Sequence, residues 1–404
     1  MRPDESPKPV VVREPDASKD ARPVLRGGSS REALSLPSPS PYDVCIRGAG
    51  ITGSTLALLL AKDRLRVGLV RQASPDTARP DVRAYALNAV SRQLLESVRA
   101  WPTGDGATPV LAMQVHGDSG GEVNFSAAQQ NVAALAWIVD VPALERELAA
   151  AARYQPLIEV LDAPAPAALT VVCEGRASAT RAEFGVAFDT TSYAQHGIAA
   201  RLQCEKPHGG IARQWFTGGE ILAFLPLAGG AGNSVAVVWS VHEARTAQLM
   251  ALPADEFARQ LQSASHGALG NLSLSSERAA WPLQLARASR WTGPGWALAG
   301  DAAHNVHPLS GQGLNLGLAD AQALARVLHG REYWRSVGDA KLLRRYERER
   351  KAGVLLLGGA TDGLQQLFVR EGDAPQALRN WGMRGFERSG PLKAWVARQA
   401  MGLN

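Results

Sequence analysis

Residues 42–62 read YDVCIRGAGITGSTLALLLAK, and this stretch decides the fold. Residues 42–47 predict a short buried strand, and residues 54–62 are apolar on nearly all sides, which is typical of a helix packed against a sheet. A second apolar run at 65–70 predicts another strand. The order strand, helix, strand predicts the start of a parallel α/β sheet.

Three glycines in the pattern G-x-G-x-x-G, Gly48, Gly50 and Gly53, lie between the first strand and the helix. Glycine permits the tight turn, the close approach of the backbone to a pyrophosphate and the close packing of helix on strand. The N–H groups and the dipole at the start of the helix favour an anion. Because a strand precedes the motif and a helix follows it, we expect dinucleotide binding; the alternative is a glycine-rich turn without a ligand.

The position where this motif usually carries an acidic ribose ligand, about 20 residues further on, holds Arg71. One interpretation is NADP, whose 2′-phosphate an arginine can bind. The others are an FAD site that holds the ribose in another way and a site that has lost affinity.

A second glycine-rich segment, residues 300–317, reads GDAAHNVHPLSGQGLNLG and follows a short predicted strand at 295–299. Apolar residues at steps of three and four then predict a helix from about Leu314 to His329, which Gly330 ends. Strand-like runs separated by Gly, Pro and polar breaks fill the middle of the chain and predict a mostly antiparallel sheet.

The second segment resembles the flavin motif of the FAD-dependent aromatic hydroxylases of the p-hydroxybenzoate hydroxylase class, and within them the ubiquinone-biosynthesis hydroxylases. The run GDAAHNVHPLSGQGLNLGLADA matches that motif almost throughout. The resemblance covers about residues 42–403 and favours FAD over NADP. Other matching segments lie at 81–88, 193–195, 207–217, 225–227, 343–350 and 361–368.

The resemblance implies a flavin site built from both glycine-rich segments. Asp301 would accept hydrogen bonds from the ribityl chain, Arg83 would lie near cofactor and substrate, and the helix start at Leu314 would stabilise the anionic reduced flavin. The implied catalytic residues, acting through their backbone in a flavin-facing turn, are Pro308 and Gly311. The implied cofactor-binding residues are Gly48, Gly50, Gly53, Arg71, Arg83, Glu174, Gly300, Asp301, Gly311, Gln312, Gly313 and Asn315.

The implied reaction is hydroxylation of a (poly)prenylated phenol in ubiquinone biosynthesis, with NAD(P)H and O₂ as co-substrates. The flavin carries the oxidative chemistry, so no Ser/His/Asp triad or carboxylate pair is needed. We expect His304 and His307 to be structural rather than catalytic.

Several features depart from the family pattern. Arg71 replaces the acidic ribose ligand, Glu174 stands in place of an aspartate, and residues 140–142 read DVP where the family tends to have an acidic residue, Asn and Arg. Residues 161–172 are too short for the usual strands, so a hairpin of the middle sheet is expected to be missing. These departures motivate a second hypothesis, an impaired hydroxylase-fold protein that acts as a binding or assembly subunit of a quinone-biosynthesis complex. Arg71 alone motivates a third, an NADP-dependent reductase.

The predicted organisation is α/β. A Rossmann-like FAD-binding domain takes residues 42–115 and 280–330, with a helix over 142–180, and an interleaved, mostly antiparallel substrate-binding sheet takes 116–141 and 181–279. Residues 331–404 are expected to be helical. The proline-rich residues 1–41 are expected to be a disordered tail.

Composition excludes several other classes. A net charge of +5 over 404 residues is too small to indicate nucleic-acid binding. No apolar run reaches the roughly 18–20 residues of a membrane span. The three cysteines are odd in number and far apart, so neither a disulfide framework nor a metal site is expected. With no apolar leader visible, we expect a cytoplasmic protein.

The last predicted helix, residues 391–403, would place Leu392, Trp395, Val396 and Leu403 on one face, with basic residues off it. A basic amphipathic helix can rest on an anionic surface, so peripheral contact with the inner membrane is one interpretation. Packing of this helix on its own domain is the favoured one.

Overall fold

The computed structural model describes residues 40–71, 81–117, 120–229, 231–306, 312–369, 385, 387 and 389–401. The predicted tail lies outside these residues except for its last two positions. Pro308, Gly311 and His307 also lie outside them, so their predicted roles stay predictions.

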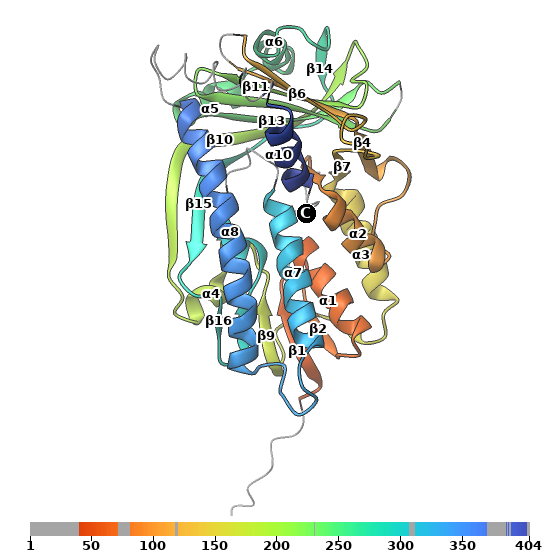
Figure 1. The fold of residues 1–404 in the computed structure, drawn as a ribbon, viewed down its shortest axis with the longest axis vertical. Helices are drawn as coiled ribbons and strands as arrows, with labels where there is room; N and C mark the ends of the chain where they lie inside the picture. The colour runs from red at the N-terminus through yellow and green to blue at the C-terminus, as the bar shows by residue number, and fades with distance from the viewer. Residues whose placement is uncertain are drawn as a thin grey trace, which may run out of the picture. The chain divides into compact units, whose positions relative to one another are not determined.

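A six-stranded sheet runs in the order β16-β17-β9-β1-β2-β8 (Figure 1). The strand bounds are Thr292–Gly293 (β16), Trp296–Leu298 (β17), Ala167–Val172 (β9), Tyr42–Arg47 (β1), Val67–Val70 (β2) and Ile158–Leu161 (β8). All neighbours pair in parallel except β16 and β17. The predicted parallel α/β sheet is therefore confirmed. Its first turn leads from β1 into α1 (Ile51–Lys62) at the carboxyl end of the strand, where such sheets bind ligands.

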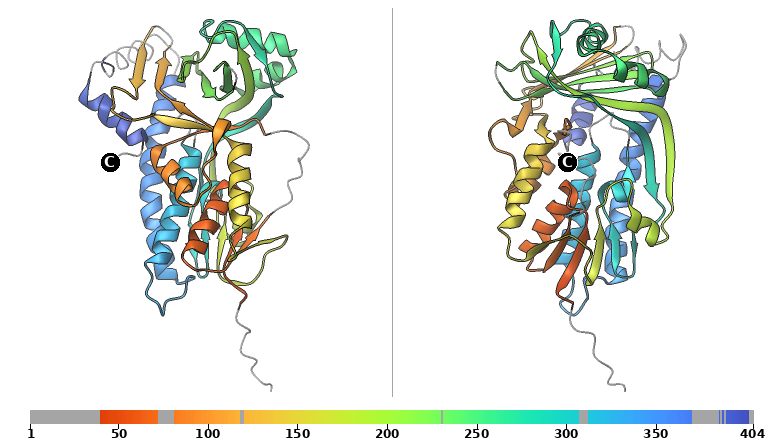
Figure 2. Two further views of the ribbon diagram at one scale, coloured as in Figure 1. Left: turned by 90° about the vertical axis from the view of Figure 1, so that its right-hand side faces the viewer. Right: turned by 180° about the vertical axis from the view of Figure 1, so that it is seen from behind.

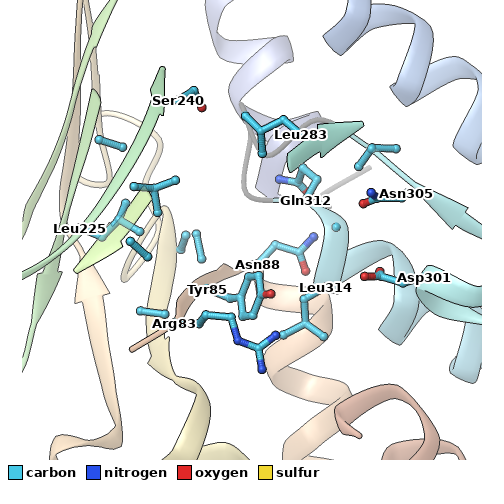
Figure 3. Close-up of a pocket in the computed structure, with 18 of the residues that line it drawn as sticks. Arg83, Tyr85, Asn88, Leu225, Ser240, Leu283, Asp301, Asn305, Gln312 and Leu314 are labelled. Carbon is cyan, nitrogen blue, oxygen red and sulfur yellow. The ribbon is translucent and has the colours of Figure 1, made fainter. Parts of the chain in front are cut away.

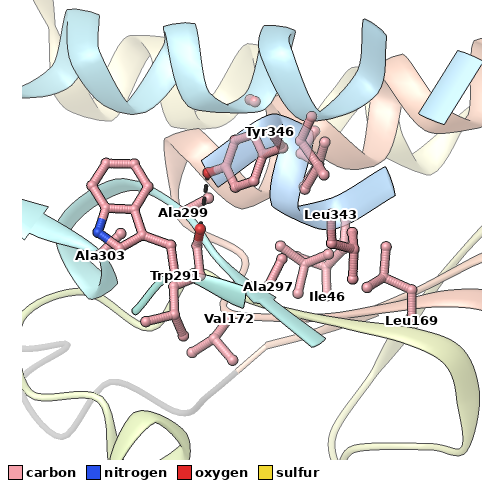
Figure 4. Packing of buried hydrophobic residues seen from close by; sticks show 14 of the residues in the cluster. Ile46, Leu169, Val172, Trp291, Ala297, Ala299, Ala303, Leu343 and Tyr346 are labelled. Atoms are coloured by element: carbon pink, nitrogen blue, oxygen red, sulfur yellow. Dashed lines mark hydrogen bonds between the residues drawn. The ribbon is translucent and has the colours of Figure 1, made fainter. Parts of the chain in front are cut away.

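Three helices cover this sheet. The helix α7 (Gly313–His329) lies between α1 and α8 (Ala340–Val369) in front of the strands (Figure 1). The fully buried Tyr346 of α8 fixes the layers together, because its hydroxyl donates a hydrogen bond of 2.9 Å to the carbonyl of Leu298 in β17 (Figure 4). Strand and helix side chains fill the core around it, among them Ile46, Leu169, Val172, Trp291 and Leu343.

The expected helix over 142–180 is wrong beyond residue 153. The helix α3 covers Val141–Arg153, and the chain then forms β8, β9 and the short helix α4 (Ala179–Glu183). Pro164 and Pro166 interrupt any helix between the two strands. The strand β9 is placed near the centre of the sheet, where Leu169, Val171 and Val172 are fully buried. Residues 158–172 thus serve the parallel sheet and supply no hairpin to the large antiparallel one.

A larger sheet of nine strands curves over one end of the parallel sheet (Figure 2). Its bounds are His304–Asn305 (β18), Ala279–Ala288 (β15), Phe188–Cys204 (β10), Ser234–His242 (β13), Glu220–Leu227 (β12), Ile211–Thr217 (β11), Ala112–His116 (β5), Glu122–Ser126 (β6) and Leu272–Leu274 (β14). All its pairs are antiparallel except β11 with β5. The mostly antiparallel second sheet is therefore confirmed.

Two strands cross the predicted domain limits. The predicted boundaries assign most of β5 and β15 to the FAD-binding part, but both strands pair within the nine-stranded sheet. Conversely, β7 (Ala136–Asp140) pairs with β3 (Ala84–Leu87) and β4 (Ala107–Val110) in a separate three-stranded sheet. The helix α2 (Ala89–Ser97) follows β3 directly.

The last helix, α10 (Pro391–Met401), packs on its own protein, and of the face predicted for it Val396 is half-buried whereas Trp395 points outward. Ala397 and Met401 are buried against residues of β5 and β6, whereas Trp395 is 59% exposed. Ala397 and Met401 are four residues apart and therefore share a helix face that Trp395 does not. In the described part of the chain, no helix combines the length and the apolar composition needed to cross a bilayer.

Candidate cofactor and substrate site

A cavity of about 1090 Å³ lies between the nine-stranded sheet and the glycine-rich turns of the α/β part (Figure 3). The two glycine-rich segments predicted to act together both reach it. Gly50, Arg83, Gly300, Asp301, Gln312 and Gly313 are among the predicted site residues that line it.

The three glycines of the first motif have two different roles: Gly48 and Gly53 allow close packing, and Gly50 borders open space. A Cβ on Gly53 would lie 1.9 Å from the carbonyl oxygen of Gly48, and a Cβ on Gly48 would lie 2.4 Å from the carbonyl oxygen of Cys173. These two glycines therefore let β1, β9 and α1 approach one another. A Cβ on Gly50 would meet nothing within 4 Å, because it points into open space at the cavity.

The positive end of the α1 dipole is not neutralised by any side chain of its cap or first turn. Gly50 is its N-cap residue and provides no side-chain cap, and the first turn has no acidic residue. Free N–H groups at such a terminus favour an anion. The open space beside Gly50 therefore fits the pyrophosphate of a dinucleotide such as FAD.

The second glycine-rich segment is held against the first by Thr52 of α1. A Cβ on Gly317 would lie 2.7 Å from the Thr52 hydroxyl, and one on Gly300 would lie 3.2 Å from it. Gly300 has a φ of +62°, which glycine adopts without strain. This turn exposes the Asp301 carboxylate to the cavity (Figure 3).

The pKa of the Asp301 carboxyl group is raised above its ordinary value. The surrounding protein withdraws water from its carboxyl group and raises its pKa, although the charges of His304, Arg176 and Arg83 act in the opposite direction. An ionised carboxylate that has lost its water is stabilised by any hydrogen-bond donor that reaches it. The ribityl hydroxyls of a flavin would provide them.

The start of α7 also reaches the cavity. Gln312, Gly313 and Leu314 line it, the N-cap residue Gln312 makes no side-chain cap, and the first turn has no acidic residue. The positive end of a second helix therefore points at the same space, which favours negative charge there.

Arg83 enters the cavity from the segment that precedes β3 (Figure 3). Its guanidinium donates to the Asp81 carboxylate, with the Nη2 of Arg83 2.6 Å from Oδ2 of Asp81. This pair raises the pKa of Arg83. Partial burial acts to raise the pKa of Asp81, but the hydrogen bonds and charge of Arg83 together lower it. Arg83 is therefore a fixed cation beside the cavity.

The nine-stranded sheet supplies the apolar wall of the cavity. Along β12, Ile221, Ala223 and Leu225 line the cavity, while Leu222 and Phe224 pack in a core with α5 (Glu243–Ala251) and α6 (Ala254–Ala264). Successive residues of a strand point to opposite faces. One face of the sheet is thus anchored to helices, and the other is free to contact a ligand.

Glu174 does not line the cavity, and its carboxylate is directed to protein groups. It accepts hydrogen bonds from the hydroxyls of Ser178 (2.7 Å) and Thr180 (2.6 Å) and from the backbone N–H of Thr180, and it pairs with Arg47. Its neighbours Gly175 and Arg176 do line the cavity. The glutamate holds the start of α4, and any contact of this turn with a ligand comes from those neighbours.

Asn315 is buried and joins α7 to the β3–α2 segment. Its Nδ2 donates to the carbonyl of Ala86 (2.9 Å), and its Oδ1 accepts from the N–H of Asn88 (3.0 Å) and the hydroxyl of Ser91 (2.7 Å). It therefore fixes the helix start rather than presenting its amide to the cavity. Arg71 lies exposed after β2 and does not line the cavity.

Sequence reasoning missed Asp320, a fully buried carboxylate in α7. Its Oδ2 accepts from the N–H of Gly300 (2.9 Å) and lies 2.6 Å from Nε2 of His304, and its Oδ1 accepts from Nε of Arg350 in α8 (2.7 Å). Burial acts to raise its pKa, but His304 and Arg350 lower it. The signal was present as one acidic residue on an otherwise apolar stretch of the flavin-like run.

His304, expected to be structural, is 2% exposed and stacks on Trp291 with ring centroids 4.9 Å apart. Together with Asp320 and Arg350 it forms a network that fixes the turn carrying Asp301. Through this turn, the network fixes where Asp301 meets the cavity.

The sequence is similar to proteins of known family. Residues 165–355 match the family profile described as an FAD binding domain. The chain is 30% identical over 417 residues to the ubiquinone hydroxylase UbiL of Rhodospirillum rubrum, with 95% of this chain and 96% of the relative covered. It is 29% identical to the 3-demethoxyubiquinol 3-hydroxylase of Escherichia coli, with 90% and 99% covered.

Solved structures agree on the fold. The p-nitrophenol 4-monooxygenase PnpA of Pseudomonas putida superposes with a TM-score of 0.73 at 17% identity, over 91% of this chain and all of that one. PqsL of Pseudomonas aeruginosa, solved with 2-aminobenzoylacetate, gives 0.70 at 21% identity, over 84% and 99%. Because the likeness to UbiL spans nearly the whole of both sequences, the chain belongs to the ubiquinone-biosynthesis hydroxylase family of FAD-dependent aromatic monooxygenases.

Proposed function

We propose that this protein hydroxylates the ring of a prenylated phenol in ubiquinone biosynthesis, with FAD as cofactor, NAD(P)H as reductant and O₂ as the source of oxygen. The observation that carries the proposal is that two positive helix ends and Asp301 face an apolar sheet wall across one cavity. Family membership supports the same reaction class.

The cofactor would be held by backbone and carboxylate groups of the two glycine-rich segments. The α1 start at Gly50 would bind the pyrophosphate, Asp301 would accept hydrogen bonds from the ribityl chain, and the α7 start at Gly313 would face the ring system. When bound, the flavin supplies electron transfer from NAD(P)H and transfer of one oxygen atom from O₂ to the substrate ring.

The protein itself would stabilise charge, exclude water and orient the substrate. The positive end of α7 favours negative charge at the cofactor end of the cavity. Leu225, Val237 and Leu283 keep water from the place where the ring would lie. Arg83, already charged and fixed by Asp81, would orient a phenolate or an acidic group of the cofactor.

Turnover with a defined phenol tests the proposal. Full-length protein loaded with FAD is incubated with 2-prenylphenol and either NADH or NADPH, and the hydroxylated product is identified by mass spectrometry. We expect nucleotide oxidation that the phenol stimulates, with product formed in step.

Flavin binding without phenol-dependent product would reject the hydroxylase reaction. The second hypothesis, a binding or assembly subunit, would then apply, and partner capture would follow. Membership of a quinone-biosynthesis complex and peripheral membrane contact stay predictions.

A further inference from the structure

The cavity has a second end, which the cofactor chemistry does not use. At the β5–β6 edge of the nine-stranded sheet, opposite the β18 edge that follows Asp301, it is lined by Met113 of β5, Phe125 of β6 and Leu135. The helix α10 adds Val396, Ala397 and Met401 to this end. These side chains are apolar, and the polar neighbour on the same sheet face is Gln214 of β11, which pairs with Val115 of β5. This end therefore suits a hydrocarbon group better than a charged cofactor.

This end is closed by a helix from the far end of the sequence. Ala397 is 5% exposed and Met401 3% exposed, and both pack with Ala127 and Leu135. The outward face of α10 carries the exposed Arg398 and Gln399. The helix therefore forms a wall of the cavity, with Val396, Ala397 and Met401 on its inner side and Arg398 and Gln399 exposed on the other.

A polar contact holds this wall to the sheet. One carboxylate oxygen of Glu387 accepts from the backbone N–H of Asn124 in β6 (3.0 Å), and the other pairs with Lys393 of α10 (2.7 Å). The Lys393 ammonium also lies 5.5 Å from the centroid of the Phe125 ring. These side-chain contacts hold α10 against β6.

We propose that the apolar compartment between α10 and the β5–β6 hairpin binds the hydrocarbon tail of the substrate, and that α10 sets the tail length the enzyme accepts. This inference rests on the proposed function. The total volume, about 1090 Å³, slightly exceeds the roughly 300–1,000 Å³ of small-molecule sites, so it accommodates more than one ring system. Each isoprene unit that enters adds buried apolar area and hence affinity.

Tail-length dependence tests this inference. The KM values of FAD-loaded full-length protein are measured for 2-prenylphenol, 2-geranylphenol and 2-farnesylphenol. We expect KM to fall by roughly ten-fold with each added isoprene unit until the compartment is full. In Ala397→Phe, whose ring would occupy the compartment, the ratio of the farnesyl to the prenyl KM rises at least about ten-fold.

Two further variants keep the test decisive. Gln399→Phe adds the same ring to the outward face of α10 and should keep the wild-type ratio. Met401→Ala enlarges the compartment and should move the ratio in the opposite direction to Ala397→Phe; if Ala397→Phe fails to fold or to bind FAD, this variant alone decides. A ratio that stays at the wild-type value in Ala397→Phe and Met401→Ala protein that binds FAD overturns the tail compartment while leaving the hydroxylase proposal intact. Absence of product with every phenol instead rejects the proposed function.

Discussion

The two ends of the cavity are built in opposite ways. The proposed cofactor end is fixed by directional contacts: two helix starts, a left-handed glycine turn, and the Asp320 carboxylate, which contacts Gly300, His304 and Arg350. The tail end is formed by apolar side chains from β5, β6 and α10. Directional contacts tolerate little change, whereas apolar surfaces tolerate volume-conserving change. Substitutions should therefore be most severe at the cofactor end.

The largest effect is expected for Asp320→Ala. This change leaves the half-buried Arg350 without its carboxylate and releases the N–H of Gly300. It should therefore lower the free energy of unfolding by about 3–5 kcal/mol and greatly weaken FAD binding. Because the folded pKa of Asp320 is lowered, its contribution is complete above the ordinary carboxyl pKa and is lost only as pH falls through the lowered value. Urea unfolding and FAD titration measure both effects.

The matched control is Glu349→Ala, on the same pair of helices. Glu349 forms an exposed ion pair with Arg326, so its loss should cost less than about 1 kcal/mol. Equal losses in the free energy of unfolding for the two variants would show that the buried network stabilises the protein no more than an exposed ion pair does.

Next in size is a contrast within the first glycine motif. In Gly53→Ala the new Cβ would collide with the carbonyl of Gly48, so we expect a loss of about 1–3 kcal/mol in stability. In Gly50→Ala the Cβ enters open space, so stability should fall by less than about 1 kcal/mol while the Kd for FAD rises about ten-fold. Thermal unfolding without FAD and FAD titration separate the two. The reverse pattern would place the pyrophosphate elsewhere.

A smaller effect is expected away from the cavity, for Tyr346→Phe. The change removes the hydrogen bond to the Leu298 carbonyl and should cost about 1 kcal/mol of stability. Tyr346 does not line the cavity, so FAD affinity should be that of the wild type. A variant that lost FAD would mean that the core and the site are coupled more tightly than the contacts indicate.

The smallest effect on stability, and one of opposite sign, is expected for Asp301→Asn. Because the folded pKa is raised, the ionised carboxylate costs stability above that pKa, and the cost disappears as pH falls through it toward the ordinary value. Flavin-free Asp301→Asn protein should therefore unfold at a higher temperature than wild type at about pH 8, with a smaller difference near pH 4. The same variant should bind FAD more weakly, so a variant with neither change would remove Asp301 from the site.

Much of the cofactor end could be predicted because it depends on local sequence. The β1–α1–β2 unit and the α7 start follow from apolar periodicity and glycine spacing within a few residues. The helix expected over 142–180 fails beyond residue 153, and the sequence carried a signal against it, because Pro164 and Pro166 break any helix between the short strands β8 and β9.

Contacts between distant residues could not be predicted. The sequence contains Glu174 as a charge near a glycine, but not the folding back of Ser178 and Thr180 onto its carboxylate. Asp320 meets Gly300 and Arg350, 20 and 30 residues away, only after two helices and a turn are assembled. The apolar pattern of α10 likewise placed Trp395 on the inner face, but the face that packs on β5 and β6 is centred on Ala397 and Met401.

The most direct test of the whole account is the visible absorption spectrum of the purified full-length protein before and after incubation with FAD. The account predicts the two bands of oxidised flavin at near-stoichiometric occupancy, retained through gel filtration. A protein that stays colourless after incubation would contradict the cofactor site assigned to the two glycine-rich segments, and with it the proposed hydroxylation.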